Sequence, residues 1–168
     1  DVYKRQVMKY AADGKRTTKK DLGRMMMTYG HVYVASIALG ANYQQAINAL
    51  IEAEAYPGPS IVIAYCPCIN HGIRSGMSHS IVEEKLAVKA GYWQLYRYNP
   101  TLAMQGKEPL TVDYPQPDGT LVNFINGEDR YADLRMVDPE AAAVLQPQLA
   151  QRVKKLYSII TGLGKVDL

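Results

Sequence analysis

The sequence predicts an α/β fold in which a mostly parallel sheet is flanked by helices. Residues 31–35 (His-Val-Tyr-Val-Ala) and 60–65 (Ser-Ile-Val-Ile-Ala-Tyr) are rich in β-branched and aromatic side chains, which is typical of strands. Between them, residues 42–55 place alanines and Leu50 at helical spacing, which indicates an amphipathic helix. Strand, helix and strand in this order predict a parallel βαβ unit, and the continuous apolar run at 60–65 predicts a strand buried on both faces.

Three further elements extend this alternating pattern. Residues 19–28 have helical spacing, and the run from Met25 to Met27 is interpreted as adaptable core filler. Residues 80–90 predict another helix, and residues 92–98 alternate like a strand with one exposed face. The 168 residues, of which 48% are hydrophobic, suffice for one ordinary core.

The composition changes after Asn99 and Pro100. Prolines and glycines are spread through a stretch without clear periodicity, which predicts an extended arm. Pro139 is suited to the first position of a helix that continues through residues 141–160. Pro147 is expected to kink or divide that helix.

The charge and hydropathy patterns argue against two classes of partner. The formal net charge is only +3, and one dense basic run lacks interleaved aromatic residues, so nucleic-acid binding is not expected; the run consists of Lys15, Arg16, Lys19 and Lys20. The longest apolar stretch is far shorter than the about 20 residues of a membrane-spanning helix. No secretory pattern is visible at the N-terminus, so we expect a cytoplasmic protein that contacts no membrane.

The densest group of reactive side chains is residues 65–72 (Tyr-Cys-Pro-Cys-Ile-Asn-His-Gly), directly after a predicted strand. Open α/β sheets place ligand sites at such strand ends. Cys66 and Cys68 are too close for a comfortable disulfide, which favours a reducing compartment. From the residues alone, either both cysteines are small buried residues or at least one binds a metal. A zinc module built on Cys66, Cys68 and His71 would need a fourth ligand that the pattern does not identify.

Other polar residues give weaker signals. His31 and His79 have no Ser, Cys or Asp partner at a recognisable spacing, so we interpret them as surface or packing residues. Glu83 and Glu84 are interpreted as a solvated helix face. No glycine-rich phosphate-binding motif is present.

Three ordered segments carry a resemblance to a known family. These are residues 27–35 (Met-Thr-Tyr-Gly-His-Val-Tyr-Val-Ala), 56–72, which ends in Cys-Ile-Asn-His-Gly, and 90–100 (Ala-Gly-Tyr-Trp-Gln-Leu-Tyr-Arg-Tyr-Asn-Pro). Together they resemble the pyruvate:ferredoxin (flavodoxin) oxidoreductases. The similarity runs from about Val7 to the end of the chain.

The resemblance implies a reaction and one cofactor ligand. Members of this family are large multidomain dimers that decarboxylate pyruvate on thiamine diphosphate, deliver the acetyl group to coenzyme A, and pass electrons through 4Fe-4S clusters to ferredoxin or flavodoxin. In the family, the cluster nearest the thiamine has four cysteine ligands, of which the last corresponds to Cys68. Cys66 stands where the family tolerates a small residue that is not a ligand. The motifs for the diphosphate and Mg²⁺ are expected upstream of Val7.

The resemblance therefore implies a C-terminal fragment of a thiamine-diphosphate-binding fold. Residues 1–6 are interpreted as a possible non-native leader, residues 7–100 as the C-terminal part of the thiamine-diphosphate-binding α/β domain, and residues 101–168 as its C-terminal arm and helical region. The isolated chain is expected to be inactive, with the remainder of the parent polypeptide as its main partner. The alternative is a non-catalytic, stand-alone subunit that completes a split 2-oxoacid oxidoreductase.

Overall fold

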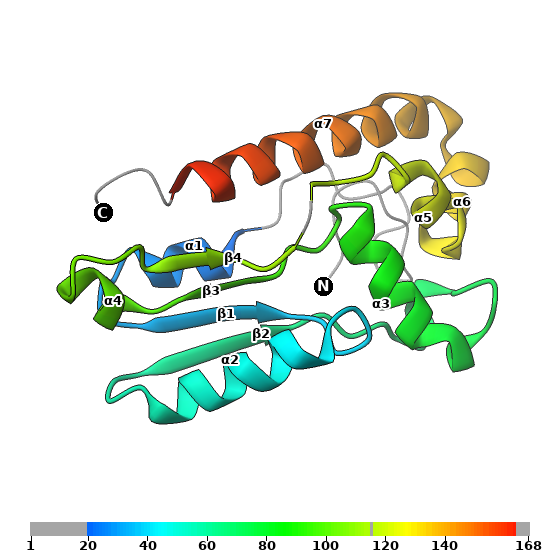
Figure 1. The fold of residues 1–168 in the computed structure, drawn as a ribbon. Coiled ribbons are helices and arrows are strands. Elements are labelled where there is room, and N and C mark those ends of the chain that lie inside the picture. Colours follow the sequence, from blue (N-terminus) through cyan, green and yellow to red (C-terminus); the bar gives the residue numbers. More distant parts are fainter. Residues whose placement is uncertain (1–19, 115, 164–168) are drawn as a thin grey trace.

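A computed structural model describes residues 20–114 and 116–163 of the chain. A four-stranded sheet with the order β2-β1-β3-β4 is flanked by helices on both faces (Figure 1), which confirms the α/β class. The strands are β1 (Tyr33–Ile37), β2 (Ser60–Ala64), β3 (Tyr96–Tyr98) and β4 (Leu110–Val112). The interpretation of residues 1–6 lies outside the described residues, as does most of the basic run.

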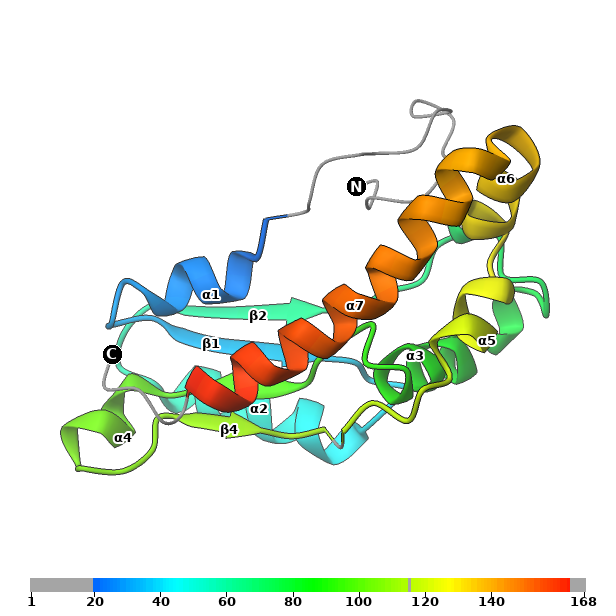
Figure 2. The same cartoon turned by 90° about the horizontal axis from the view of Figure 1, so that it is seen from above.

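Helices cover the two faces and one end of the sheet. Helix α2 covers one face, α1 and α7 cover the other, and α3, α5 and α6 gather beyond the carboxyl ends of β1 and β2 (Figures 1 and 2). The helices are α1 (Leu22–Met27), α2 (Tyr43–Ala55), α3 (Ser80–Lys89), α4 (Pro100–Met104), α5 (Leu121–Asn126), α6 (Asp129–Val137) and α7 (Pro139–Leu163), with short 3-10 turns η1 (Ile69–His71) and η2 (Met77–His79). In the part of the chain that is described, no helix combines the length and the apolar character needed to cross a membrane.

Strand β1 is the centre of the fold, and all five of its residues are buried. Because successive side chains of a strand point to opposite faces, Tyr33, Ala35 and Ile37 pack under α2, whereas Val34 packs with β3 and β4 on the α1 and α7 side. Strand β2 is an edge strand and only partly buried, so the expectation that residues 60–65 form a strand buried on both faces is wrong.

The expectation of a mostly parallel sheet is wrong for the strands β3 and β4. Strands β1 and β2 are parallel, whereas β3 pairs antiparallel with β1 and β4 pairs antiparallel with β3. A parallel third strand would require a crossover that returns the chain along the sheet. Helix α3 instead lies beyond the sheet, and residues after it are fastened near the carboxyl end of β1: the Trp93 indole donates to the Ile37 carbonyl at 3.0 Å, and the Ser36 hydroxyl donates to the Gln94 carbonyl at 2.6 Å. The chain therefore enters β3 from that end.

The region after Pro100 is more regular than expected. The predicted arm contains β4, α5 and α6, and the predicted final helix begins with Pro139 as expected. Pro147 lies inside α7 without dividing it. Proline removes one helical hydrogen bond, and both Pro147 and Ala143, whose carbonyl loses that bond, are exposed, so water can compensate.

Candidate functional site

The cysteine segment follows the carboxyl end of β2, as the sequence predicts. Tyr65 is buried, Cys66 is exposed, Pro67 is buried and Cys68 is exposed, an alternation typical of extended backbone. Both cysteines are free thiols. The alternative that both are small buried residues is therefore wrong, and the Cys68 side chain is accessible to a partner or a metal.

The turn that carries Cys68 is held from both sides. The His71 backbone N–H donates to the Cys68 carbonyl at 3.0 Å, and this bond closes η1. Gly72 follows in the left-handed conformation with φ of 63°. A second segment then clamps this loop, because the Asp129 N–H donates to the Gly72 carbonyl at 2.9 Å and Ile73 forms an antiparallel bridge with Glu128.

A buried charged pair lies behind this turn. Glu128 is fully buried and Arg130 is 2% exposed, and the Arg130 Nε donates to a carboxylate oxygen of Glu128. The other Glu128 oxygen lies 3.9 Å from the His71 Nδ1, and the His71 ring stacks on Tyr65 with ring centroids 6.4 Å apart. The Arg130 guanidinium also lies 5.1 Å from the centre of the Tyr131 ring, within the range of a cation–π contact.

Burial shifts the protonation equilibria of these groups. Loss of solvent raises the pKa of Glu128 to about 7, although the Arg130 charge acts in the opposite direction. Loss of solvent and the charge of Arg130 lower the pKa of His71 to about 4, so its imidazole is neutral at physiological pH. Burial also raises the pKa of Glu83.

The lowered pKa of His71 predicts a loss of stability in acid. Protonation of the folded state becomes favourable only near pH 4, whereas the unfolded chain binds this proton near its ordinary value of 6.5. The contribution of the neutral ring is therefore present above about pH 6.5 and is lost as the pH falls toward 4. Relative to a His71→Gln variant, the wild-type chain should lose unfolding free energy over this interval, as measured by urea denaturation at several pH values. His79→Gln, at an exposed position, is the control. Equal pH profiles for the wild type and His71→Gln would contradict the assignment.

The burial of several charged residues near the site was not predicted from the sequence. Glu83 and Glu84, interpreted as solvated, are 4% and 8% exposed, because α3 packs against α5 and the loop before α2, where Glu84 accepts the Gly40 N–H at 2.7 Å. Glu128 and Arg130 stand in a short polar sequence after Gly127 that reads as a turn, and no local pattern marks them as buried. His31 and His79 are exposed, as expected.

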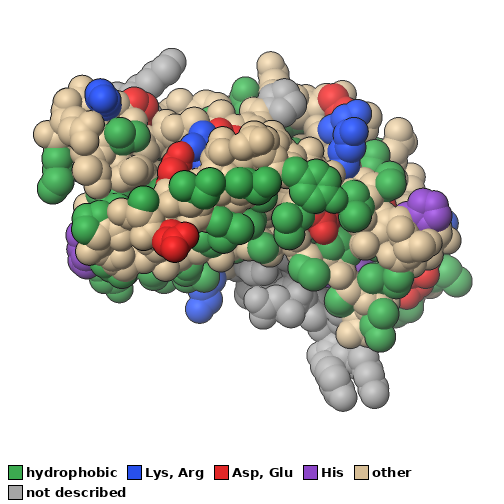
Figure 3. All heavy atoms as spheres, turned by 60° about the horizontal axis from the view of Figure 1, so that its bottom comes forward, with side chains coloured by type: hydrophobic (Ala, Val, Ile, Leu, Met, Phe, Trp, Pro, Cys, Tyr) green, Lys and Arg blue, Asp and Glu red, His purple; other side chains and the backbone are tan. Residues whose placement is uncertain are grey.

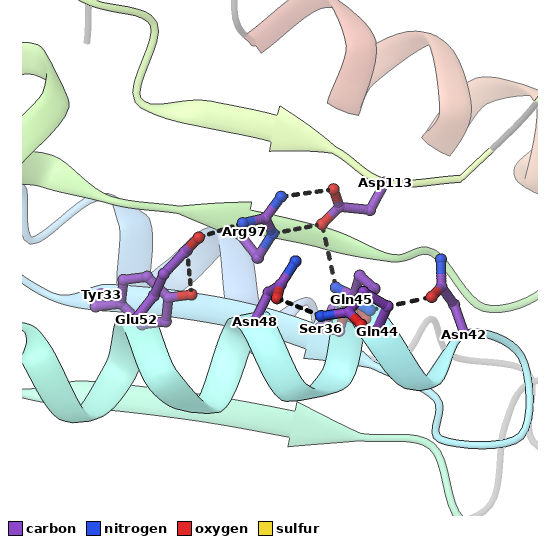
Figure 4. A network of polar contacts seen from close by, with 9 residues as sticks. All are labelled: Tyr33, Ser36, Asn42, Gln44, Gln45, Asn48, Glu52, Arg97 and Asp113. Atoms are coloured by element: carbon purple, nitrogen blue, oxygen red, sulfur yellow. Dashed lines mark hydrogen bonds and ion pairs between the residues drawn. The ribbon is translucent and has the colours of Figure 1, made fainter.

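A second polar network lies between α2 and the sheet (Figure 4). Arg97 of β3 donates to both carboxylate oxygens of Asp113, at 2.8 and 3.0 Å, and forms an ion pair with Glu52 of α2. The Tyr33 hydroxyl donates to Glu52 at 2.9 Å, and Gln45 donates to Asp113 at 3.2 Å. The charged groups of this network pair with one another. We therefore infer that the network stabilises the packing of α2 on β1 and β3.

No group of three His, Cys, Asp or Glu side chains within residues 20–114 and 116–163 is arranged to hold a metal ion. The zinc module on Cys66, Cys68 and His71 is not assembled, since the His71 ring is directed at Tyr65 and Glu128. Within the described residues, the thiols of Cys66 and Cys68 are accessible to a metal ion, and the backbone of the turn that carries Cys68 is bound by the 127–129 segment.

The fold and the site together define a broad class of protein, an α/β domain with free cysteines at the end of a strand. Comparisons with known sequences identify the family within that class. No protein-family model matches the chain. The chain is 56% identical over 139 residues to pyruvate:ferredoxin oxidoreductase of Moorella thermoacetica, covering 83% of this chain and 12% of that protein. It is 52% identical over 139 residues to pyruvate-flavodoxin oxidoreductase of Klebsiella pneumoniae, with the same coverages. It is also 43% identical over 152 residues to the mitochondrial NADP(+) pyruvate dehydrogenase of Euglena gracilis, covering 90% of this chain and 8% of that protein.

These matches confirm the resemblance noted in the sequence. The chain belongs to the pyruvate:ferredoxin and pyruvate-flavodoxin oxidoreductase family over the segment that it matches. It spans only 8% to 12% of the length of these three relatives.

Proposed function

We propose that this chain forms part of an oxidoreductase that converts pyruvate and coenzyme A to acetyl-CoA and CO₂ and passes the electrons through 4Fe-4S clusters to ferredoxin or flavodoxin. The observation that carries this proposal is the 56% identity to the Moorella thermoacetica enzyme over most of the chain. The remainder of the enzyme, in the same polypeptide or in a partner chain, would bind thiamine diphosphate and Mg²⁺. We expect a cytoplasmic homodimer, in which this chain alone is inactive.

We assign to Cys68 the role of one ligand of a 4Fe-4S cluster. Its free, exposed thiol suits a thiolate ligand, and the bond from the His71 N–H to the Cys68 carbonyl limits the movement of its backbone. One thiolate cannot hold a cluster, so the other three ligands would come from outside this chain. The cluster, when bound, supplies a one-electron acceptor close to the thiamine cofactor.

The surface supports the idea that this chain is one part of a larger assembly. Helix α2 carries several large hydrophobic side chains that are exposed, and they form a band over it that continues toward α3 (Figure 3). Contiguous exposed apolar side chains often mark a surface that another protein segment covers, and within the described residues β2 lies at an edge of the sheet beside this helix. The exposed apolar residues of this band include Leu39, Tyr43, Ile47, Leu50, Ile51 and Ile81.

The two cysteines provide a matched test of the ligand assignment. In the assembled oxidoreductase, Cys68→Ser should remove one cluster, with a loss of about four iron atoms per chain and of the corresponding electron paramagnetic resonance signal. Cys66→Ser should retain the iron content and the signal, because Cys66 is also exposed but is not assigned as a ligand.

Retention of the full iron content by Cys68→Ser would overturn the ligand assignment. Loss of a cluster in Cys66→Ser alone would transfer the assignment to Cys66. Zinc in place of iron in the purified wild-type assembly would also contradict the proposed function.

A further inference from the structure

We propose that the buried pair Glu128–Arg130 is a positioning device for the turn that carries Cys68, and that it tunes the reduction potential of the cluster to which Cys68 binds. This inference rests on the proposed function, because it requires a cluster at Cys68. Both residues would act through the conformation of the turn and through their charge.

A short chain of contacts connects the pair to the ligand. The Cys68 carbonyl accepts the His71 N–H at 3.0 Å, so the ligand and His71 form one turn. The His71 ring lies between Tyr65, on which it stacks, and Glu128, whose nearer oxygen is 3.9 Å from its Nδ1. The backbone on either side of Glu128 also binds this loop, through the Asp129 N–H to the Gly72 carbonyl and the Arg74 N–H to the Gly127 carbonyl.

The same contacts place the charges of Arg130 and Glu128 behind the turn. Arg130 and the ionised form of Glu128 together are neutral, and both are withdrawn from water, so their fields are poorly screened. Removal of either charge changes the net charge next to the turn by one unit. The potential of an iron-sulfur cluster depends on nearby net charge as well as on solvent exposure, because reduction adds a negative charge to the cluster.

Stability alone is a weak explanation for such a pair. A buried ion pair often gives no more stability than apolar side chains of similar volume, since the cost of removing two charges from water offsets their attraction. Other charges of the same segment remain in water: Arg74 and Asp129 form an ion pair at 3.0 Å with side chains 56% and 50% exposed. Unlike the Arg74–Asp129 pair, the Glu128–Arg130 pair is buried beneath the cysteine turn, which indicates a role at that turn.

The test is a redox titration of the Cys68-dependent cluster in the assembled oxidoreductase, followed by electron paramagnetic resonance. Glu128→Gln removes one negative charge from behind the turn and should shift the potential to a more positive value. Arg130→Lys keeps the charge and should shift it less. Arg74→Gln, which breaks the exposed pair of the same segment, is the control and should leave the potential unchanged.

An unchanged potential and line shape in Glu128→Gln would overturn the inference. An equal shift in Arg74→Gln would also overturn it, because the effect would then be one of general charge. If Glu128→Gln does not assemble, Glu128→Asp, which keeps the charge and shortens the side chain, replaces it; an unaltered line shape and potential in that variant contradict the positioning role. If Cys68→Ser keeps its cluster, the proposed function itself fails, whereas a Cys68-dependent cluster that ignores Glu128 refutes only this inference.

Discussion

Replacement of Arg130 by methionine should lower the unfolding free energy of the chain by about 3–5 kcal/mol. Methionine can fill much of the volume of the arginine stem, so the main loss is electrostatic. Glu128 is fully buried, and its ion pair with Arg130 is removed while its carboxylate remains out of water. Urea denaturation of the wild-type and variant chains, monitored by circular dichroism, measures the difference.

Two further variants isolate this cause. Arg74→Met breaks an ion pair whose two side chains are half exposed, and such pairs contribute only about 0–1 kcal/mol. A double variant, Arg130→Met with Glu128→Leu, removes both charges and should recover much of the stability that Arg130→Met loses. A loss in Arg130→Met no larger than that in Arg74→Met would show that the buried pair is not a significant electrostatic contact.

The deficit of Arg130→Met should also depend on pH, in a direction set by Glu128. Burial raises the pKa of this carboxyl from 4.5 to about 7, so the folded state holds the proton to a higher pH than the unfolded state. The cost of burying the ionised group is therefore absent below about pH 4.5 and increases as the pH rises through the folded value. Without Arg130, which lowers this pKa, the deficit should be smallest in acid and should continue to grow above pH 7.

The helices and strands with strong local patterns were predictable from the sequence, and the direction of β3 was not. The apolar stripe of 42–55 and the runs at 31–35 and 60–65 mark α2, β1 and β2 because their periodicity reflects burial. The orientation of β3 depends on the position from which the chain continues after α3. That position is set by long-range contacts such as the hydrogen bond from Trp93 to Ile37. Periodicity carries no information on that point.

The site shows the same division between local and distant causes. Cys68 could be selected because its neighbours in the sequence form a distinctive segment at the end of a strand. Glu128 and Arg130 lie some sixty residues away in the chain and are brought to the turn by the bridge between Ile73 and Glu128. Charged residues are rarely buried, so composition argues against placing them in a core. Their role becomes visible only when burial and pairing are known.

Replacement of Gly72 by alanine should destabilise the chain by roughly 3 kcal/mol and should also disturb the Cys68 turn. Gly72 has φ of 63°, a conformation that costs an L-residue about 1–2 kcal/mol. A Cβ at this position would lie 2.6 Å from the Cβ of Asp129, which is far closer than two carbon atoms can approach. Because the Asp129 N–H is bonded to the Gly72 carbonyl, relief of the clash must separate the two segments that hold the turn.

A second glycine separates the clash from the backbone strain. Gly106 has φ of 70°, and a Cβ there would meet no atom within 4 Å, so Gly106→Ala should cost only about 1 kcal/mol. The excess loss in Gly72→Ala measures the contact with Asp129. In a Cys66→Ser background, the alkylation rate of the remaining Cys68 thiol should change with Gly72→Ala and stay constant with Gly106→Ala. Equal losses of stability in the two alanine variants, with an unchanged alkylation rate, would mean that the 127–129 segment does not fix the conformation of the cysteine turn.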